Sequence, residues 1–343
     1  MRVLVAMSDG VDSSLAAALL LEQGHEVLGG TLSLVDQGPA DGAPDPEAAA
    51  AGIGIPFTRW DQRAAFEHLV VSPFVAAYAQ GRTPNPCALC NARVKFGLLL
   101  EKARELGADV LATGHYAGIV AGPDGAVRLV RGADRRKDQS YFLFAIARAA
   151  LSRVLFPLGA HTKDAVRAMA RERGLAAAER PESQEICFVP GDDYAGFLAR
   201  RAPKGAFVPG AIVDSAGRRL AEHRGLANYT VGQRRSLGIA TGRPLYVVAL
   251  DVVRNQLVVG PDDELWRREL TAAEVNWLVD EPVGAFRAAV RIRSRHEPAP
   301  ATLTPAGGGM WRVQFDEPQR AITPGQAAVF YDGETVLGGG WIQ

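Results

Sequence analysis

The first fourteen residues most constrain what this chain can fold into. Residues 3–7 are apolar and predict a buried strand, which stops at a small, polar loop. A helix is then predicted over residues 13–23, with Leu15, Leu19 and Leu20 on one face. Unpaired backbone N–H groups and the helix dipole make such a helix start an anion site. An ordinary strand-to-helix turn uses similar small, helix-capping residues, so the loop alone leaves both interpretations open.

The loop has the sequence Ser-Asp-Gly-Val-Asp-Ser over residues 8–13. It lacks the Gly-Lys-Ser/Thr spacing of a Walker A loop. It resembles the Ser-Gly-Gly-x-Asp-Ser loop of ATP pyrophosphatases, which cleave ATP between the α and β phosphates and leave AMP on an acceptor oxygen. Asp9 departs from that pattern, because it stands where the pattern has its first glycine.

The N-terminal half alternates strand and helix signals, which predicts an α/β fold with a doubly wound parallel sheet. Ligands bind such a sheet at the carboxyl ends of its strands. We expect strands over residues 26–34 and 110–115, a mobile loop over 39–46, and helices over 93–106 and 162–174, the last capped by Thr162 and stopped by Gly174.

Beyond residue 190, glycine and proline become frequent and short alternating runs replace long helices. These runs predict a small β-barrel. The predicted strands cover residues 245–252, 256–259, 285–295, 311–315, 327–331 and 336–342. The resulting domains are a catalytic domain (1–189), a small linking domain (190–266) and a C-terminal β-barrel (267–343).

The formal net charge of the 343 residues is zero, so no global basic field indicates nucleic-acid binding. Local basic stretches at residues 135–137, 200–201, 234–235 and 291–295 are candidates for RNA contacts, although each alone also fits a solvated surface. No apolar run reaches the length of a membrane span and no signal peptide is predicted. Three cysteines argue against a disulfide scaffold, so we expect a cytoplasmic protein with no membrane partner.

A second distinctive segment, over residues 83–91, carries two of the three cysteines, Cys87 and Cys90. Prolines flank Asn85 and restrict its backbone, and a helix is predicted from about Asn91. A thiol at a helix start has a lowered pKa and is more nucleophilic. The third cysteine, Cys187, lies where the first domain is predicted to end.

Several chemistries fit these cysteines. A zinc site would need another ligand, such as His115, and no histidine has finger-like spacing. A thioredoxin-like pair fits the Cys-x-x-Cys spacing but not its surroundings. Three thiolates also suit an iron–sulfur cluster with one open iron. Buried inert cysteines, and a persulfide carrier with a resolving cysteine, remain as further interpretations.

Seven segments, in chain order, resemble the bacterial tRNA-specific 2-thiouridylases, and the resemblance covers essentially the whole chain. The most specific are Thr-Pro-Asn-Pro-x-x-x-Cys-Asn and Lys-Asp-Gln-Ser-Tyr-Phe. The segments are residues 8–14, 81–96, 112–116, 137–142, 183–188, 229–238 and 322–330.

The resemblance implies roles for individual residues. Cys90 matches the nucleophile and Cys187 the persulfide carrier, with a transient Cys90–Cys187 disulfide. Cys87 matches a position where some members have Asp, which implies a place in the base pocket or in proton transfer. Nucleotide contacts match Ala6, Met7, Ser8, Asp9, Gly10, Val11, Asp12, Ser13, Leu32 and Gly114. Target-base contacts match Asn85, Pro86 and Cys87. Contacts to tRNA match His115, Lys137, Asp138, Gln139, Arg293, Ser294 and Gln326, and Ser294 replaces a frequent aromatic residue.

The resemblance also implies the reaction. ATP activates the C2 oxygen of the wobble uridine in tRNAs for Lys, Glu and Gln. Sulfur then displaces AMP, either by direct attack of the Cys187 persulfide or as sulfide that Cys90 releases from it. Mg²⁺ is expected with ATP, and Asp12 either orients that ion or helps the loop to fold. The expected partners are tRNA and a protein sulfur donor, either a cysteine desulfurase or a relay protein.

Three alternatives remain. One is a different ATP pyrophosphatase, such as an amide-forming or guanidine-forming synthetase, which would not need the cysteines. Another is a catalytically weak tRNA-binding paralogue, because the Asp9 carboxylate would face a triphosphate. The last is a three-cysteine, iron–sulfur-dependent thiolase.

Overall fold

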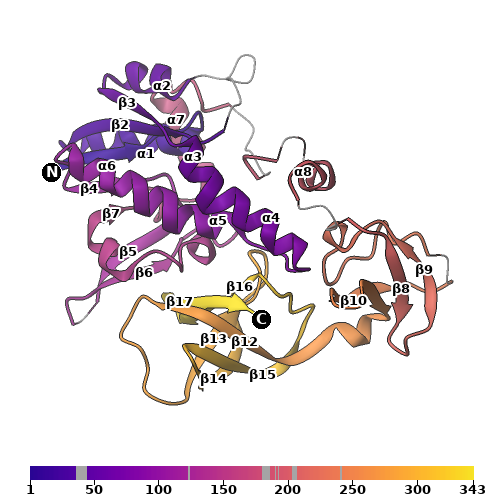
Figure 1. The fold of residues 1–343 in the computed structure, drawn as a ribbon. Coiled ribbons are helices and arrows are strands. Elements are labelled where there is room, and N and C mark those ends of the chain that lie inside the picture. Colours follow the sequence, from indigo (N-terminus) through magenta and orange to yellow (C-terminus); the bar gives the residue numbers. More distant parts are fainter. Residues whose placement is uncertain are drawn as a thin grey trace.

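The computed structural model describes residues 1–35, 45–122, 124–179, 186–189, 191, 193–202, 207–239 and 242–343. Figure 1 shows the N-terminal domain above, the C-terminal barrel below it and the central domain to one side. No helix in these ranges is long and apolar enough to cross a membrane.

The N-terminal domain is built on a five-stranded sheet with the order β3-β2-β1-β4-β7, in which every pairing is parallel. This topology is doubly wound, because the chain moves outward from β1 in both directions. The predicted α/β class is therefore confirmed. The strands are β1 (Arg2–Ala6), β2 (Glu26–Ser33), β3 (Phe57–Asp61), β4 (Val110–Ala112) and β7 (Val154–Leu155).

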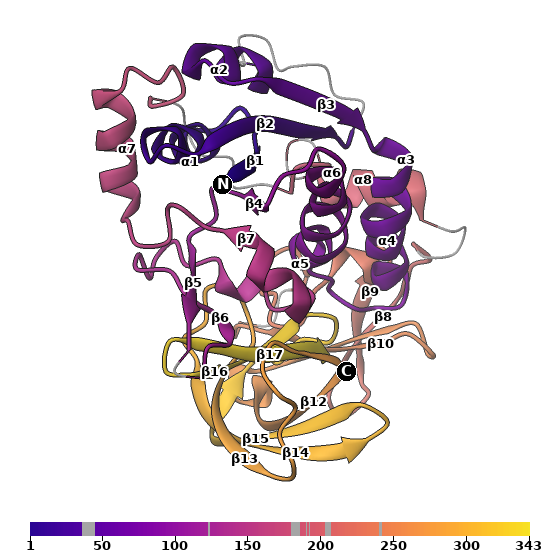
Figure 2. The same ribbon diagram turned by 90° about the vertical axis from the view of Figure 1, so that its left-hand side faces the viewer.

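Helices cover both faces of the sheet, as Figure 2 shows. Alternate residues of β1 explain this: Val3 and Val5 pack into one hydrophobic cluster, whereas Leu4 packs into another. The helices of this domain are α1 (Val11–Glu22), α2 (Pro46–Ile53), α3 (Arg63–Phe66), η1 (Glu67–Val71), α4 (Ser72–Ala79), α5 (Pro86–Leu89), η2 (Cys90–Leu99), α6 (Leu100–Glu105), η3 (Ser140–Phe142), η4 (Arg148–Arg153) and α7 (Lys163–Glu172).

The helix predicted over residues 93–106 is part of a longer helical run. It starts at α5 with Asn85 as its N-cap, passes through the π-helix η2 and ends as α6. The helix predicted over residues 162–174 is present as α7, and Thr162 caps it by accepting from the Ala165 N–H at 3.2 Å. Most of the loop predicted over 39–46 lies outside the described residues, and Pro46 already begins α2.

The C-terminal domain is a barrel of six antiparallel strands, closed by the pairing of β12 with β17. The sequence patterns located parts of four strands but missed β12 and β14. The barrel strands are β12 (Trp266–Trp277), β13 (Phe286–Arg291), β14 (Ala299–Gly307), β15 (Met310–Arg320), β16 (Ala327–Asp332) and β17 (Thr335–Ile342).

The N-terminal domain adds a hairpin to the barrel's sheet. Strands β5 (Ala117–Ala121) and β6 (Val127–Arg131) pair with each other, and β6 meets β17 at Val130 and Thr335. Sequence reasoning did not anticipate this hairpin. It gives the two domains a shared sheet and a shared core, which includes Leu129 and Val336.

The central domain is a four-stranded sheet with the order β10-β11-β8-β9. Strands β10 and β11 correspond to the two predicted strands around the turn at residues 254–255. Helix α8 lies between this sheet and the N-terminal domain (Figure 1). The elements are α8 (Tyr194–Arg201), β8 (Gly210–Asp214), β9 (Arg219–His223), η6 (Leu226–Asn228), β10 (Tyr246–Asp251), β11 (Gln256–Gly260) and η7 (Asp262–Leu265).

Candidate active site

A cavity of about 530 Å³ opens at the carboxyl ends of β1, β2 and β4 and extends to the helix that carries Cys90. It joins the N-terminal loop to all three cysteines, which come from three separate parts of the sequence. Thirteen of the residues expected to be functional line it: Ala6, Met7, Ser8, Asp12, Ser13, Leu32, Pro86, Cys87, Cys90, Gly114, His115, Gln139 and Cys187.

The remaining expected residues do not line this cavity. In the loop, Asp9 is exposed, Gly10 is half-buried and Val11 is buried at the start of α1. Asn85 is buried, and its Oδ1 accepts from the Ala88 N–H at 3.2 Å to cap α5. The full set outside the lining is Asp9, Gly10, Val11, Asn85, Lys137, Asp138, Arg293, Ser294 and Gln326.

The loop between β1 and α1 is held in shape by its serines. The Ser8 N–H donates to Ser13 Oγ at 3.0 Å, and Ser13 Oγ also lies 3.2 Å from the carbonyl oxygen of Gly10. No side chain caps α1, whose N-cap is Gly10. The first turn of α1 therefore keeps backbone N–H groups for an anion.

The carboxylate of Asp12 is fixed by two residues that sequence reasoning missed. Lys163 Nζ lies 2.7 and 2.8 Å from its two oxygens, and the Tyr116 hydroxyl donates to Oδ1 at 2.8 Å. Lys163 is almost fully buried at the start of α7, and Lys163 and Asp12 are far apart in the sequence. No local sequence pattern could have identified this ion pair. This network orients the one carboxylate that lines the described part of the cavity.

Gly114 brings the end of β4 against the start of α1. A Cβ atom at this position would lie 2.8 Å from the Asp12 carbonyl carbon and 2.9 Å from the Ser13 nitrogen. Real Cβ contacts with backbone atoms are not that close, so only glycine fits without moving α1. This close approach gives a physical reason for glycine at a position that the sequence assigned to nucleotide contact.

The three cysteines are free thiols. Cys90 is buried, whereas Cys87 and Cys187 reach solvent, but the walls of the cavity surround all three. This desolvation raises the pKa of Cys90 to about 11 and raises the pKa values of Cys87 and Cys187. The pKa values of Cys87 and Cys90 are therefore raised and not lowered as a helix start would predict, because desolvation is the largest influence on both.

Cys187 is held by the residue that follows it. The Phe188 ring packs edge-on against Phe66 and Phe74, with centroids 5.6 and 5.2 Å apart, and lies 5.5 Å from the Phe197 ring. These rings come from the N-terminal domain and from α8. The cluster anchors residues 186–189 beside the cavity, so Cys187 lies at its edge.

His115 lies inside the cavity wall and not on an RNA-facing surface. Its ring packs near Phe96 and Phe156, and its Nδ1 is 2.6 Å from the Thr113 hydroxyl oxygen. Complete burial lowers the pKa of His115 well below its usual value, so the imidazole is neutral near pH 7. A direct contact from His115 to RNA would have to be made by a base inside the cavity.

Asp138 is buried in an ion pair with Arg291 of the barrel. Arg291 Nη1 lies 2.9 Å from Asp138 Oδ2, and the Asp138 side chain has no exposed surface. The same carboxylate accepts from the Gly132 and Ser140 N–H groups at 3.1 Å. This geometry explains Asp138 as a link between two domains, and it leaves its side chain no surface to offer to tRNA.

Gln326 and Arg293 also connect domains. Gln326 Nε2 donates to the carbonyl oxygens of Thr83 and Pro84 at 3.0 and 3.4 Å. Arg293 Nη2 donates to the Val231 carbonyl oxygen of the central domain at 3.1 Å, and burial lowers its pKa. Gln326 thus holds the loop that leads to Cys87.

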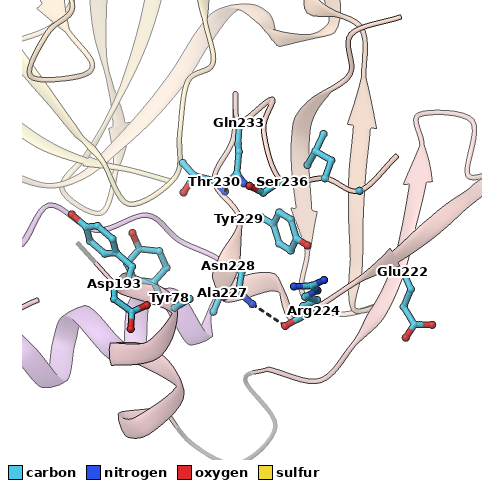
Figure 3. A pocket seen from close by; sticks show the side chains of 14 residues that line it. Tyr78, Asp193, Glu222, Arg224, Ala227, Asn228, Tyr229, Thr230, Gln233 and Ser236 are labelled. Carbon is cyan, nitrogen blue, oxygen red and sulfur yellow. Dashed lines mark hydrogen bonds between the residues drawn. The ribbon is translucent and has the colours of Figure 1, made fainter. Parts of the chain in front are cut away.

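A second cavity, of about 950 Å³, lies between α4, α8 and the central domain. Figure 3 shows Tyr78, Asp193 and Tyr229 around it, with the Asn228 amide donating to the Arg224 carbonyl oxygen. It contains neither the N-terminal loop nor a cysteine. We therefore place the chemistry in the smaller cavity, although the second one is larger.

The fold and the cavity together define a HUP-domain protein with two appended β domains. Family models match each part: the tRNA methyl transferase HUP domain over residues 1–191, the tRNA methyl transferase PRC-barrel domain over 195–261, and the aminomethyltransferase β-barrel domain over 267–342. The chain belongs to the family of tRNA-specific 2-thiouridylases.

Curated relatives establish this membership. The chain is 51% identical to the tRNA-specific 2-thiouridylase MnmA of Geobacter metallireducens, over 99% of this chain and 96% of that protein. It is 50% identical to MnmA of Chloroflexus aurantiacus, over 99% and 98% of the two chains, and 49% identical to MnmA of Syntrophotalea carbinolica, with the same coverage.

The comparisons do not support the alternatives raised from the sequence. The relatives are thiouridylases over their full length and not amide-forming or guanidine-forming synthetases. In the described ranges, no group of three or more His, Cys, Asp or Glu side chains is placed to hold a metal ion, so the structure offers no support for a three-cysteine cluster. The Asp9 side chain lies outside the cavity lining, so the reason for proposing an inactive paralogue is weakened.

Proposed function

We propose that the protein makes 2-thiouridine at the wobble position of tRNAs for Lys, Glu and Gln, with ATP activating the uridine. The observation that carries this proposal is the single cavity shared by the phosphate-type loop and the three cysteines. One space with an anion site and thiols suits two successive transfers to one base, first of AMP and then of sulfur.

The adenylation half uses the loop and α1. The triphosphate binds at the uncapped first turn of α1, where backbone N–H groups meet negative charge. The uridine O2 attacks the α-phosphorus, the bond from the α-phosphorus to the bridging oxygen breaks, and pyrophosphate leaves. This step turns a poor leaving group, a carbonyl oxygen, into AMP.

Mg²⁺ fits this arrangement as an ion bound mainly by the nucleotide. It commonly takes one or two carboxylates together with phosphate oxygens and water, and Asp12 is the one carboxylate that lines the described part of the cavity. Asp12 would hold the ion while Lys163 and Tyr116 keep its carboxylate in place. When bound, Mg²⁺ neutralises phosphate charge.

The sulfur half uses Cys90 and Cys187. A protein donor, such as a cysteine desulfurase or a relay protein, passes a sulfur atom to Cys187, which reaches solvent at the cavity edge. The Cys90 thiolate attacks Cys187 Sγ, the persulfide bond breaks and hydrosulfide leaves with the electron pair. Hydrosulfide adds to C2 of the activated uridine and AMP leaves with its oxygen. The Cys90–Cys187 disulfide is then reduced by a dithiol.

The base reaches the cavity from the anticodon loop. A loop nucleotide can be flipped out at low cost and held by stacking and hydrogen bonds. Pro86, Cys87 and Gln139 line the space that it would enter. Lys137 and the residues near Arg293 lie outside this space, and we assign them to the tRNA surface, where binding weakens as salt rises.

The test is a set of serine variants assayed with ATP, unmodified tRNA and a persulfide donor. Cys90→Ser and Cys187→Ser should abolish 2-thiouridine, measured by mass spectrometry of the nucleosides, while tRNA-dependent pyrophosphate release continues. Cys87→Ser is the comparison variant, since it removes a thiol from the same cavity that takes no covalent part in the scheme. It should still form 2-thiouridine, although more slowly if the thiol helps to hold the base.

Two results would overturn the proposal. Full thiolation by Cys90→Ser or Cys187→Ser would exclude the persulfide–disulfide route. Absence of pyrophosphate release by the wild-type protein with an unmodified tRNA would exclude adenylation, and a tRNA-binding protein without activity would then explain the fold better.

A further inference from the structure

The cavity contains a cation that the reaction scheme has not used. Lys95 is the one Lys or Arg side chain among the described residues that line it. Lys95 makes no hydrogen bond and no ion pair with any described residue, whereas Lys163 is fully engaged by Asp12. Among the residues that the structure describes, the titratable side chains facing this space are Asp12, Cys87, Cys90, Lys95, His115 and Cys187.

The π-helical turn of η2 determines where Lys95 points. Lys95 lies five residues after Cys90, and in an α-helix of about 3.6 residues per turn this spacing separates two side chains by roughly 140°. In a π-helix the hydrogen bonds run from i to i+5, so residue i+5 returns close to the face of residue i. Both Cys90 and Lys95 are within the π-helix Cys90–Leu99, and both line the cavity.

The charged groups around the three thiols indicate a role for the Lys95 ammonium. Desolvation raises the pKa values of all three thiols, and His115 is neutral, so the thiols lack another cationic neighbour in the described lining. Lys95 acts in the opposite direction and lowers the pKa of each thiol. Asp12, the only acid in the described part of the lining, is already paired with Lys163.

We propose that Lys95 is the counter-charge for sulfur in this cavity: its ammonium stabilises the Cys90 thiolate before attack and the hydrosulfide after release. The link to hydrosulfide rests on the proposed function, whereas the link to the thiolate does not. The residue alters no bond itself. On this proposal, η2 supplies the sulfur half of the reaction, and the N-terminal loop and Lys163 supply the ATP half.

The direct test measures thiol ionisation without tRNA or ATP. Iodoacetamide alkylation of each cysteine is followed against pH by peptide mass spectrometry, together with the ultraviolet absorbance of thiolate. In Lys95→Met the alkylation of Cys90 should slow about tenfold near pH 8, which corresponds to one unit of pKa. Lys95→Arg keeps the charge and should stay within about twofold of the wild-type rate.

Lys102→Met is the matched control. Lys102 lies on α6 of the same helical run and pairs with Glu105 at 2.8 Å, outside the cavity. Its removal should leave the alkylation of Cys90 unchanged. If Lys95→Met does not fold, Lys95→Gln provides the uncharged variant, and circular dichroism verifies the fold of each.

Unchanged Cys90 alkylation and thiolate absorbance in the uncharged variant would overturn the proposal, and so would an equal loss in Lys95→Arg. A second assay connects the residue to the reaction: with tRNA, ATP and a persulfide donor, Lys95→Met should lose thiolation and keep pyrophosphate release. If the wild-type protein makes no 2-thiouridine, the proposed function fails, while the alkylation result still decides the role of Lys95 towards the thiols.

Discussion

Replacing Asp138 with Asn tests whether this residue joins domains or contacts tRNA. The change keeps the size of the side chain and removes its charge. In the structure the carboxylate faces Arg291 at 2.9 Å and Arg131 at 3.4 Å. The Asp138 side chain has no exposed surface, and Arg291 is only 6% exposed. Neither guanidinium can turn to water without opening the interface between the N-terminal domain and the barrel.

The expected loss follows from this burial. Removing one partner of a buried ion pair leaves an uncompensated charge and costs about 3–5 kcal/mol. The Asp316–Arg287 pair of the barrel provides the comparison, because its side chains are 48% and 58% exposed. An exposed pair of this kind contributes about 0–1 kcal/mol. Asp138→Asn should therefore lower the free energy of unfolding far more than Asp316→Asn does.

Urea denaturation followed by tryptophan fluorescence measures both variants, since Trp277, Trp311 and Trp341 all lie in the barrel domain. A double variant, Asp138→Leu with Arg291→Met, should recover part of the loss by removing both charges. The reasoning is refuted if Asp138→Asn and Asp316→Asn differ by less than about 1 kcal/mol. Weaker tRNA binding at unchanged stability would instead support a direct RNA contact.

Four further predictions concern the cavity. Lys163→Met frees the Asp12 carboxylate and should slow tRNA-dependent pyrophosphate release at least about tenfold at saturating ATP, and an unchanged rate would contradict the role given to this pair. Gly114→Ala places a Cβ atom 2.8 Å from the Asp12 backbone and should abolish ATP binding in equilibrium dialysis. Asp9→Gly should change ATP affinity less than about threefold, because the Asp9 side chain does not line the cavity, and a larger gain would show that Asp9 repels phosphate. Because burial raises the pKa of Cys90 to about 11, its alkylation rate should still be rising with pH above 9.0, and a plateau below that value would contradict the raised pKa.

The sequence predicted those parts of the site that depend on neighbouring residues. The strand, loop and helix at the N-terminus are consecutive in the sequence, so their pattern could be recognised locally. The same holds for α7, whose cap Thr162 and first helical residue are adjacent. Position within a doubly wound sheet then placed the loop at the carboxyl ends of the strands.

Interactions between distant residues were not predictable in this way. Lys163 is 151 residues from Asp12, and Arg291 is 153 residues from Asp138, so nothing in either local pattern indicates its partner. Lys95 was missed for a different reason. The helix was expected to begin near Asn91, which left Cys90 outside it, whereas Cys90 and Lys95 both belong to the π-helix Cys90–Leu99.

The loop before the cysteines is where the three domains meet. The Thr83 N–H donates to the Pro324 carbonyl oxygen at 2.9 Å, and its hydroxyl donates to the Thr230 hydroxyl at 3.3 Å. Gln326 holds the Thr83 carbonyl from the barrel. If tRNA contacts the barrel and the central domain, as proposed, these hydrogen bonds connect that contact to the loop before Pro86 and Cys87. This gives the appended domains a mechanical connection to the chemistry.

The two cysteines to which the proposed reaction assigns sulfur transfer, Cys90 and Cys187, are held by different elements. Cys90 belongs to a helical run that packs into the core through Phe96 and Leu99. Cys187 belongs to residues 186–189, where the Phe188 ring packs against Phe66 and Phe74. Because both are free thiols in this structure, forming the Cys90–Cys187 bond requires one of them to approach the other. Both elements are packed: the helical run through Phe96 and Leu99, and residues 186–189 through Phe188, which shares a hydrophobic cluster with Cys90.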